Sequence, residues 1–488
     1  MNPQVIIVGA GPTGLTLAID LARRGVPVRI VDRAAEFFAG SRGDGLQPRT
    51  LEVFDDLGVL DAVLAHGAPQ APLLVHLDGE FVMERRMSAW REPTADVPHP
   101  NPWVLAQADT ERVLRERLAE FGVRVESGTA LADFSADPDG VTVRLEHDGV
   151  TEQVRAGYLV GADGGRSTVR KALGIAFEGV TDESIRLLLG DVCADALDHS
   201  VGYWFADSDS PMDGIALMPL PGGRKFQFAT GLDADSGTGL EVLQEHVTRR
   251  SRRADIVLSD LSWSTVWRPN VRLAQRYRSG RVFLAGDAAH VHPPTGGQGL
   301  NTGVQDAYNL GWKLAAALRD PGAATDALLD SYETERRAVA ARVLGLSSEL
   351  LDKTVKGDPD AMDREGTHQL DISYRDAQDN SPAVRAGDRA PDAPLIDANG
   401  KTIRLFDLFR GPHATLLVFG RDTTGDPDRS PVTDLRTVRL TGTETALVEG
   451  EFSDAEGHAR RAYDAADGTW MIVRPDGHLG AVGTATAR

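Results

Sequence analysis

Three segments of the chain place glycines, in two of them together with an aspartate, directly after a short apolar run. They are Gly9–Gly14, Asp163–Gly164 and Gly286–Asp287. Such runs are typical of buried parallel strands, and ligands of open α/β sheets bind beyond the carboxyl ends of these strands. A carboxylate there can accept hydrogen bonds from the hydroxyls of a sugar or ribitol chain, and a glycine-rich turn exposes backbone N–H groups. The three segments therefore predict a site for an extended, nucleotide-like ligand.

The third segment continues into a turn rich in proline and glycine. Val282–Ala285 predicts the strand, and the turn holds Pro293 and Pro294. A helical pattern follows this glycine-rich turn, from Val304 to about Leu318. The first N–H groups of a helix and its positive dipole end suit an anion or a polarised carbonyl. The alternative is a strand-turn-helix with an ordinary polar cap.

The first segment is a complete G-x-G-x-x-G between two predicted strands, Val5–Val8 and Val28–Val31. The first glycine permits a tight turn, the second lets the backbone approach a pyrophosphate, and the third lets helix and strand pack closely. The acid after the second strand can hold an adenosine ribose. The residues expected at this dinucleotide site are Gly9, Gly11, Pro12, Thr13, Gly14, Asp32 and Arg33. NAD and FAD both fit the motif.

Two arginines, Arg42 and Arg49, lie in and just after a polar stretch that precedes a predicted helix at Thr50–Leu57. Their guanidinium groups can approach the phosphates or the ring of a bound cofactor. The alternative is that both are solvated loop arginines. A third candidate, Gln107, stands where the chain returns to the nucleotide fold before another helical pattern, and Val125 belongs to a further strand of that fold.

The composition limits the class of protein. A length of 488 residues predicts two or three domains, and a net charge of −20 argues against nucleic-acid or anionic-membrane partners. No apolar run is long enough to span a bilayer, and the N-terminus does not resemble a signal peptide. The single cysteine, Cys193, excludes an intrachain disulfide and a cysteine-rich metal site. We expect a cytoplasmic protein.

The elements that must position these residues predict an α/β fold with an inserted sheet. Residues 66–103 leave the nucleotide fold, and 185–281 contain short alternating strands that predict an antiparallel sheet over the ligand. A pocket between the two parts is the usual place for a substrate. The apolar residues that line such a pocket, or simply form core, are Trp204, Phe205, Met218, Phe226 and Phe228. An antiparallel hairpin is predicted with its turn at Asp148-Gly149.

The segment Tyr158–Arg170 completes a specific combination, with Ser167 as the expected helix N-cap. Together with Gly9–Gly14 and Gly286–Asp287, it resembles the class A flavoprotein monooxygenases of the para-hydroxybenzoate hydroxylase fold. The stretch AAHVHPPTGGQGLNTGVQDAYNLGWKL at 288–314 is most similar to the phenol hydroxylase and polyketide hydroxylase branch. The resemblance covers the whole chain. It implies that FAD is the bound cofactor and that NAD(P)H is a transient co-substrate.

The resemblance also assigns roles to residues of this sequence. Gly11–Gly14 would hold the FAD pyrophosphate, Asp32 the adenosine ribose, and Asp287 the ribityl hydroxyls. Backbone N–H groups of Gly299, Leu300 and Asn301 would face the flavin pyrimidine carbonyl, where negative charge develops on reduction. The remaining expected contacts are Gln107 near the ribityl or phosphate region, Asp163 and Arg170 on the path shared by FAD and NAD(P)H, Arg33, Arg42, Val125, Gly286, and Pro293 in the wall between flavin and substrate.

The domain division follows from the same resemblance. The FAD-binding domain would comprise 1–75, 104–184 and 281–370, the substrate-binding sheet domain 76–103 and 185–280, and a thioredoxin-like domain 385–488. Residues 354–390 are acidic and contain Pro and Gly, so they predict a linker. The C-terminal module has no cysteine, which excludes dithiol chemistry and leaves packing or oligomer contacts.

The implied activity is hydroxylation of an aromatic substrate, phenolic or polyketide-type, with NAD(P)H and O2, through a flavin C4a-hydroperoxide. A Baeyer–Villiger oxygenase acting on a ketone is the alternative within this fold, and a non-catalytic nucleotide-binding scaffold is the alternative outside enzymes. No catalytic acid or base is assigned. His290 and His292 are interpreted as structural, no metal site is expected, and the protein is expected to be a monomer or a homodimer.

Overall fold

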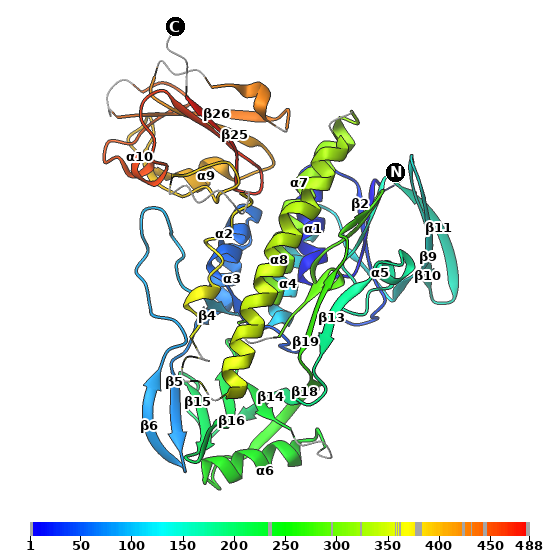
Figure 1. Ribbon diagram of the computed structural model, residues 1–488, viewed down its shortest axis with the longest axis vertical. Coiled ribbons are helices and arrows are strands. Elements are labelled where there is room, and N and C mark those ends of the chain that lie inside the picture. The colour runs from blue at the N-terminus through cyan, green and yellow to red at the C-terminus, as the bar shows by residue number, and fades with distance from the viewer. Residues whose placement is uncertain are drawn as a thin grey trace.

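The computed structural model places the predicted nucleotide fold between an antiparallel sheet region and a C-terminal module (Figure 1). The residues that it describes are 3–232, 237–293, 296–322, 325–356, 358, 360, 363–375, 383–421, 425–430, 432–442 and 447–484. Pro294 lies outside the described residues. Within the described residues, no helix combines the length and the apolar character that crossing a membrane requires.

The central sheet is parallel except for one short edge strand, β20. Its strands in spatial order are β20 (Arg278–Ser279), β21 (Val282–Leu284), β12 (Tyr158–Gly161), β1 (Val5–Val8), β2 (Val28–Asp32) and β8 (Val125–Ser127). The strands expected before each of the three glycine motifs are thus neighbours, β1 beside β12 and β12 beside β21. Because parallel strands end at one edge, the motifs meet there.

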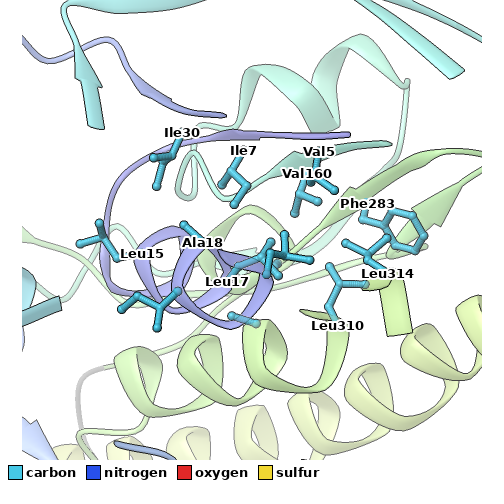
Figure 2. Close-up of a cluster of buried hydrophobic side chains, with 14 of the residues drawn as sticks. Val5, Ile7, Leu15, Leu17, Ala18, Ile30, Val160, Phe283, Leu310 and Leu314 are labelled. Atoms are coloured by element: carbon cyan, nitrogen blue, oxygen red, sulfur yellow. The ribbon is translucent and has the colours of Figure 1, made fainter. Parts of the chain in front are cut away.

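Two helices cover one face of this sheet, α1 (Pro12–Arg23) directly and α7 (Gly299–Arg319) against α1. Figure 2 shows the apolar side chains between them, with Leu15, Leu17 and Ala18 of α1, Leu310 and Leu314 of α7, and Ile7, Ile30, Val160 and Phe283 of the strands. Every one of these side chains is buried. The remaining helices of this region are α2 (Pro48–Leu57), α3 (Leu60–His66), α4 (Gln107–Glu120), α5 (Thr168–Ala172) and α8 (Thr325–Lys356).

Smaller sheets frame the central one. The first is the hairpin unit β9 (Thr129–Asp137), β10 (Gly140–His147) and β11 (Val150–Ala156). Asp148 and Gly149 have φ values of +48° and +75°, the two positive φ angles of a type I′ turn, so the predicted hairpin is confirmed. The others are β13 (Phe177–Thr181) with β19 (Asn270–Ala274) and β22 (His290–Val291), and β3 (Gly45–Leu46) with β7 (Trp103–Val104) and β4 (Ala68–Pro69).

The inserted sheet has seven strands and is antiparallel except for the β15–β5 pair. Their order is β18 (Leu258–Trp267), β14 (Leu187–Ala194), β17 (Lys225–Gly231), β16 (Ser210–Pro219), β15 (Gly202–Asp207), β5 (Leu73–Leu77) and β6 (Glu80–Arg85). The division placed between residues 75 and 76 therefore falls inside β5. A helix that the sequence analysis did not predict, α6 (Leu240–Ser251), packs on one face of this sheet.

The C-terminal module lies at one end of the molecule in Figure 1, and the inserted sheet lies at the other. The C-terminal module contains a mixed sheet. Its strands in spatial order are β24 (Thr402–Arg404), β23 (Pro394–Ile396), β27 (Glu451–Ser453), β26 (Leu435–Thr441), β25 (Ala414–Phe419), β28 (Thr469–Val473) and β29 (Leu479–Thr484). Two short helices, α9 (Leu405–Phe409) and α10 (His458–Ala462), belong to it. The strand β25 lies between β26 and β28, and β28 and β29 form an antiparallel hairpin.

Part of the predicted linker is buried and hydrogen-bonded to other elements. Its described part includes residues 363–375, and there Thr367 and Gln369 are only 1% and 3% exposed. His368 accepts a backbone hydrogen bond from Arg49 of α2, and Arg364 donates one to Met87. This part is a packed segment, whereas residues 376–382 lie outside the described chain.

Candidate active site

The glycine loop after β1 is shaped by two close contacts and one open position. A Cβ at Gly9, whose φ is +105°, would lie 2.3 Å from the carbonyl oxygen of Ala162 at the end of β12. A Cβ at Gly14 would lie 2.0 Å from the Gly9 carbonyl oxygen. At Gly11, no described protein atom lies within 4 Å of the corresponding position. The loop is therefore tightly packed on its inner side and open above Gly11.

Helix α1 starts beside this open position without a side-chain cap. Its N-cap residue, Gly11, makes no side-chain cap hydrogen bond, and Pro12 occupies the first turn. Asp32, at the end of β2, accepts hydrogen bonds from the N–H groups of Ala10 at 2.8 Å and Ala34 at 2.9 Å. Its half-buried carboxylate therefore holds the loop and keeps lone pairs for a ribose hydroxyl. The following residue, Arg33, is exposed.

Thr13 joins the first motif to the third. Its hydroxyl oxygen lies 2.5 Å from the position of a Cβ at Gly286 and 2.3 Å from that of a Cβ at Gly303. Gly286 has a φ of +59°, which favours glycine for a second reason. The structure thus uses the Thr13 side chain to pack the glycine loop against the Gly286 turn and α7. This packing role differs from the phosphate contact considered for Thr13.

The second motif is tied to the third by an arginine. Asp163 accepts a hydrogen bond from the N–H of Thr168 at 2.6 Å, and the Ser167 hydroxyl accepts one from Arg170, which confirms Ser167 as the N-cap of α5. The Arg170 guanidinium donates to the carbonyl oxygens of Gly165 and Ala288, both at 2.8 Å. Asp163 therefore fixes the start of α5, and Arg170 connects the second motif to the backbone of the Gly286 turn.

Asp287 is exposed, whereas Gly286 and Ala288 on either side of it are buried. Burial nevertheless raises the pKa of its carboxyl group, and nearby His290 opposes that rise. Arg42 is exposed, and its guanidinium group lies over the ring of Phe38, 4.4 Å from the ring centroid. The charge of Arg42 also acts to lower the pKa of Asp287 and that of Glu111, in both cases against the larger effect of burial.

Behind this turn lies a fully buried group of charges. Asp306 accepts hydrogen bonds from Gly286 N–H at 3.0 Å, from His290 Nε2 at 2.6 Å and from Arg336 Nε at 2.7 Å. The structural interpretation of His290 is in line with these contacts. His292 is half-buried, and the surrounding protein lowers its pKa to about 4, so it is neutral at physiological pH. Pro293, which follows it, is buried.

The start of α7 has backbone donors for which the described part of the chain offers no acceptor. Its N-cap residue, Gln298, makes no side-chain cap hydrogen bond, and its carbonyl accepts the N–H of Thr302 at 2.8 Å. The N–H groups of Gly299–Asn301 precede that first bond and have no intrahelical acceptor. The Asn301 side chain accepts from Gln47 N–H and donates to the carbonyls of Gly45 and Gly297. Asn301 therefore fixes the loop beside the helix start.

The structure also shows where three further candidate cofactor residues lie: Gln107, Val125 and Arg49. Gln107 is the first residue of α4, and its amide donates to Glu111 at 2.7 Å. Val125 begins β8 and is half-buried. Arg49 is not a solvated loop residue. It is 4% exposed on α2 and donates to the carbonyl of Asp476 in the C-terminal module, so the interpretation as a solvated loop arginine is wrong.

The sequence analysis missed a carboxylate pair where the FAD-type fold meets the inserted sheet. Asp191 of β14 accepts hydrogen bonds from Ser41 N–H at 3.0 Å and Ser41 Oγ at 2.5 Å, and Gln227 donates to the same hydroxyl at 3.0 Å. Asp44 lies in the same loop, and burial together with the Asp191 charge raises its pKa to about 6. The only signal in the sequence was a polar stretch, Ser41–Gly45.

The aromatic candidates lie mainly on the other face of the inserted sheet. Phe205, Phe226 and Phe228 are almost fully buried in the core beneath α6, and β17 alternates, so Gln227 between them faces the opposite side. Trp204 donates its indole N–H to Pro211 in the neighbouring strand. The face toward the glycine motifs instead carries Asp191, Gln227 and Trp263, which are register partners.

Comparison with known proteins agrees with this geometry. A family model described as "FAD binding domain" matches residues 2–347. A flavin-dependent monooxygenase from Mycobacteroides abscessus is 43% identical over 98% of this chain and 96% of its own length. The 6-methylpretetramide 4-monooxygenase of Streptomyces rimosus is 34% identical over 99% of this chain and 91% of its own length.

Solved structures resemble the whole chain. The flavin-dependent monooxygenase PieE, in complex with FAD and substrate, has a TM-score of 0.84 and 26% identity over 99% of this chain and 96% of its own. A ternary complex of aklavinone-11 hydroxylase with FAD and aklavinone has a TM-score of 0.83 and 28% identity, covering 100% of this chain and 97% of its own.

Proposed function

The chain belongs to the FAD-binding-domain family of flavin-dependent monooxygenases, and from this premise we propose that it hydroxylates a phenolic or polyketide-type aromatic substrate, consuming NAD(P)H and O2. The observation that carries the proposal is the meeting of the three glycine motifs around open, uncapped helix starts at Gly11 and Gly299. Relatives named for polycyclic aromatic substrates, 6-methylpretetramide and aklavinone, support the substrate class.

FAD would lie along the edge where β2, β1, β12 and β21 end. Asp32 would hold the adenosine ribose, and the backbone from Gly11 to Gly14 would hold the pyrophosphate in the space above Gly11. The exposed carboxylate of Asp287 would accept hydrogen bonds from the ribityl hydroxyls. The free N–H groups of Gly299–Asn301 would receive the flavin pyrimidine carbonyl. The remaining proposed contacts are Arg33, Arg42, Gln107, Val125, Asp163 and Pro293.

The bound flavin would supply the redox chemistry, with NAD(P)H as reductant and oxygen transfer from a C4a-hydroperoxide. The protein would bind and orient the aromatic ring between the loop at 41–45 and the face that carries Asp191, Gln227 and Trp263. Asp44, with a pKa of about 6, would accept the proton of a phenolic hydroxyl near neutral pH. The predicted division into three domains is part of this proposal, with β5 assigned to the substrate sheet.

Purified protein should carry the visible absorption of a flavin, and an aromatic polyketide should stimulate NAD(P)H oxidation in air. Anhydrotetracycline and aklavinone, named for two relatives, are suitable first probes. Mass spectrometry should show one added oxygen on an aromatic ring. A lactone formed from a ketone would instead identify a Baeyer–Villiger oxygenase. Protein without bound flavin, even after incubation with FAD, would refute the proposal.

Asp287→Ala tests the assignment of the cofactor's central part. Loss of an acceptor that pairs with ribityl hydroxyls should weaken FAD binding about tenfold, as measured by FAD retention on gel filtration and by fluorescence titration. Glu116→Gln, on the exposed side of α4, is a control that should bind FAD like the parent. Equal FAD affinity of Asp287→Ala and the parent would show that Asp287 is misassigned.

A further inference from the structure

The segment Asp363–Arg375, which we call the strap, leads from α8 toward the C-terminal module and packs beside the start of α7. Arg364 donates a backbone hydrogen bond to Met87, and His368 accepts one from Arg49. Ile372 is 2% exposed and packs against Val339 and Val343 of α8. The strap is thus fixed at several points to elements that are distant in the sequence.

Gln369 has an unusual backbone within this strap. Its φ is +62°, a left-handed conformation that non-glycine residues adopt rarely. The other described non-glycine residues with positive φ are Asp78, Asp148, Arg252, Asp260 and Asp464. Among them Gln369 alone is buried, at 3% exposure. A backbone conformation of this kind persists where the surroundings determine it, and it is found preferentially at functional sites.

The side chain of Gln369 explains what determines its conformation. Its amide nitrogen donates to Gln298 Oε1 at 3.2 Å and to Thr302 Oγ1 at 3.3 Å. Its amide oxygen accepts from Gln305 Nε2 at 2.6 Å. These three partners are the N-cap residue of α7 and the two residues four and seven positions later, which lie on one face of the helix.

The first turn of α7 is therefore held on two sides. On the side of α2, Asn301 is fixed by Gln47 at 2.8 Å. On the side of the strap, Gln369 fixes Gln298 and Thr302. Between these contacts lie the N–H groups of Gly299–Asn301, which have no intrahelical acceptor. Their direction depends on the position of this turn.

We propose that Gln369 is a positioning residue for the flavin. It fixes the first turn of α7 so that the free N–H groups of Gly299–Asn301 meet the pyrimidine carbonyl of the ring. The inference rests on the proposed function, because it requires FAD at this helix start. It assigns an active-site role to a segment whose composition predicts only a linker.

Two variants separate hydrogen bonding from backbone strain. Gln369→Gly removes the three hydrogen bonds and relieves the positive φ, whereas Gln369→Leu removes them and keeps the bulk and the strain. Both should release FAD about tenfold faster than the parent and shift its visible absorption bands, because buried hydrogen bonds that place the donors are lost. FAD release is followed by fluorescence, and the melting temperature of the apoprotein is measured in parallel.

Two control variants reproduce the relief of a positive φ and the loss of stability at positions in the C-terminal module. Asp464→Gly relieves a positive φ at an exposed position of the C-terminal module, and Val438→Ala destabilises the core of that module. Both should retain FAD with parental bands. The proposal would be overturned if both Gln369 variants released FAD at the parental rate and kept the parental absorption bands. It would also be overturned if only the leucine variant differed from the parent, because that result would reflect steric crowding by leucine. A parent protein that binds no FAD would instead refute the proposed function.

Discussion

At the scale of single residues, the main electrostatic feature of the site is Asp44. Burial and the neighbouring Asp191 raise its pKa to about 6, above its usual value of 3.8. The folded protein therefore favours the neutral form of this carboxyl group. Its stabilising contribution is complete below pH 3.8 and is lost as the pH rises toward about 6. A group that lowers stability at neutral pH in this way is expected at functional sites.

Asp44→Asn should therefore act on stability and on activity in opposite directions. At neutral pH the variant should gain up to about 3 kcal/mol in free energy of unfolding, because two pKa units correspond to that value. Hydroxylation should fall, and the decrease of kcat/KM below about pH 6 should disappear. Urea titrations on both sides of this pH and a pH–rate profile measure the two effects. Equal stability with an unchanged acidic limb would contradict the role of Asp44.

Residues whose function depends on their neighbours in the sequence could be predicted. Ser167 caps α5, and Asp148-Gly149 forms the hairpin turn, because cap and turn chemistry is local. Arg49 and Gln369 could not, since their partners are distant. Arg49 donates to Asp476, 427 positions away, and Gln369 donates to Gln298, 71 positions away. No local pattern reports such contacts.

At the scale of elements, β17 decides between the two interpretations of its phenylalanines, pocket lining and core. Phe226 and Phe228 face the core beneath α6. The residue between them, Gln227, reaches Ser41 in the loop of the FAD-type fold. The helix α6 was predictable, because Leu240, Leu243 and Val247 recur at helical spacing, and α6 determines which face of the sheet is core.

Adjacent positions of β17 should therefore behave differently. Phe228→Ala should lower the free energy of unfolding by about 3–5 kcal/mol, as expected when a buried phenylalanine leaves a cavity. Its folded fraction should keep the parental KM for the aromatic substrate. Gln227→Ala should raise KM with little loss of stability, because its partner Ser41 also bonds Asp191. Denaturant titration and steady-state kinetics distinguish the two, and a raised KM in the Phe228 variant would contradict this assignment of faces.

At the scale of the whole molecule, the C-terminal module is attached through buried charges. Glu335 of α8 accepts from Lys313 of α7 and from Arg474 of the module, both at 2.7 Å. Asp476 accepts from Asn309 of α7 at 2.9 Å, and its carbonyl accepts from Arg49 of α2. The packing role expected for a module without cysteine is thus a connection to the helices that border the cofactor site.

Glu335→Gln should show how strong this connection is. The change leaves Lys313 and Arg474 without their shared carboxylate in a buried place, which should lower the free energy of unfolding by about 3 kcal/mol. Glu116→Gln breaks an exposed pair with Arg112 and should cost less than about 1 kcal/mol. Urea titration monitored by fluorescence compares the two. Equal losses would show that the interdomain charges behave like surface charges.

The position of Thr13 has a consequence for biosynthesis. Its hydroxyl packs against Gly286 and Gly303, so the nucleotide loop at the very start of the chain is completed by residues that the ribosome adds far later. At typical synthesis rates, an interval of this length corresponds to roughly 15–60 s. During that time, the nascent N-terminal strand and helix lack the surface that closes their glycine turn. We expect the cofactor site to form only after residue 303 has left the ribosome, and FAD to bind after synthesis of α7.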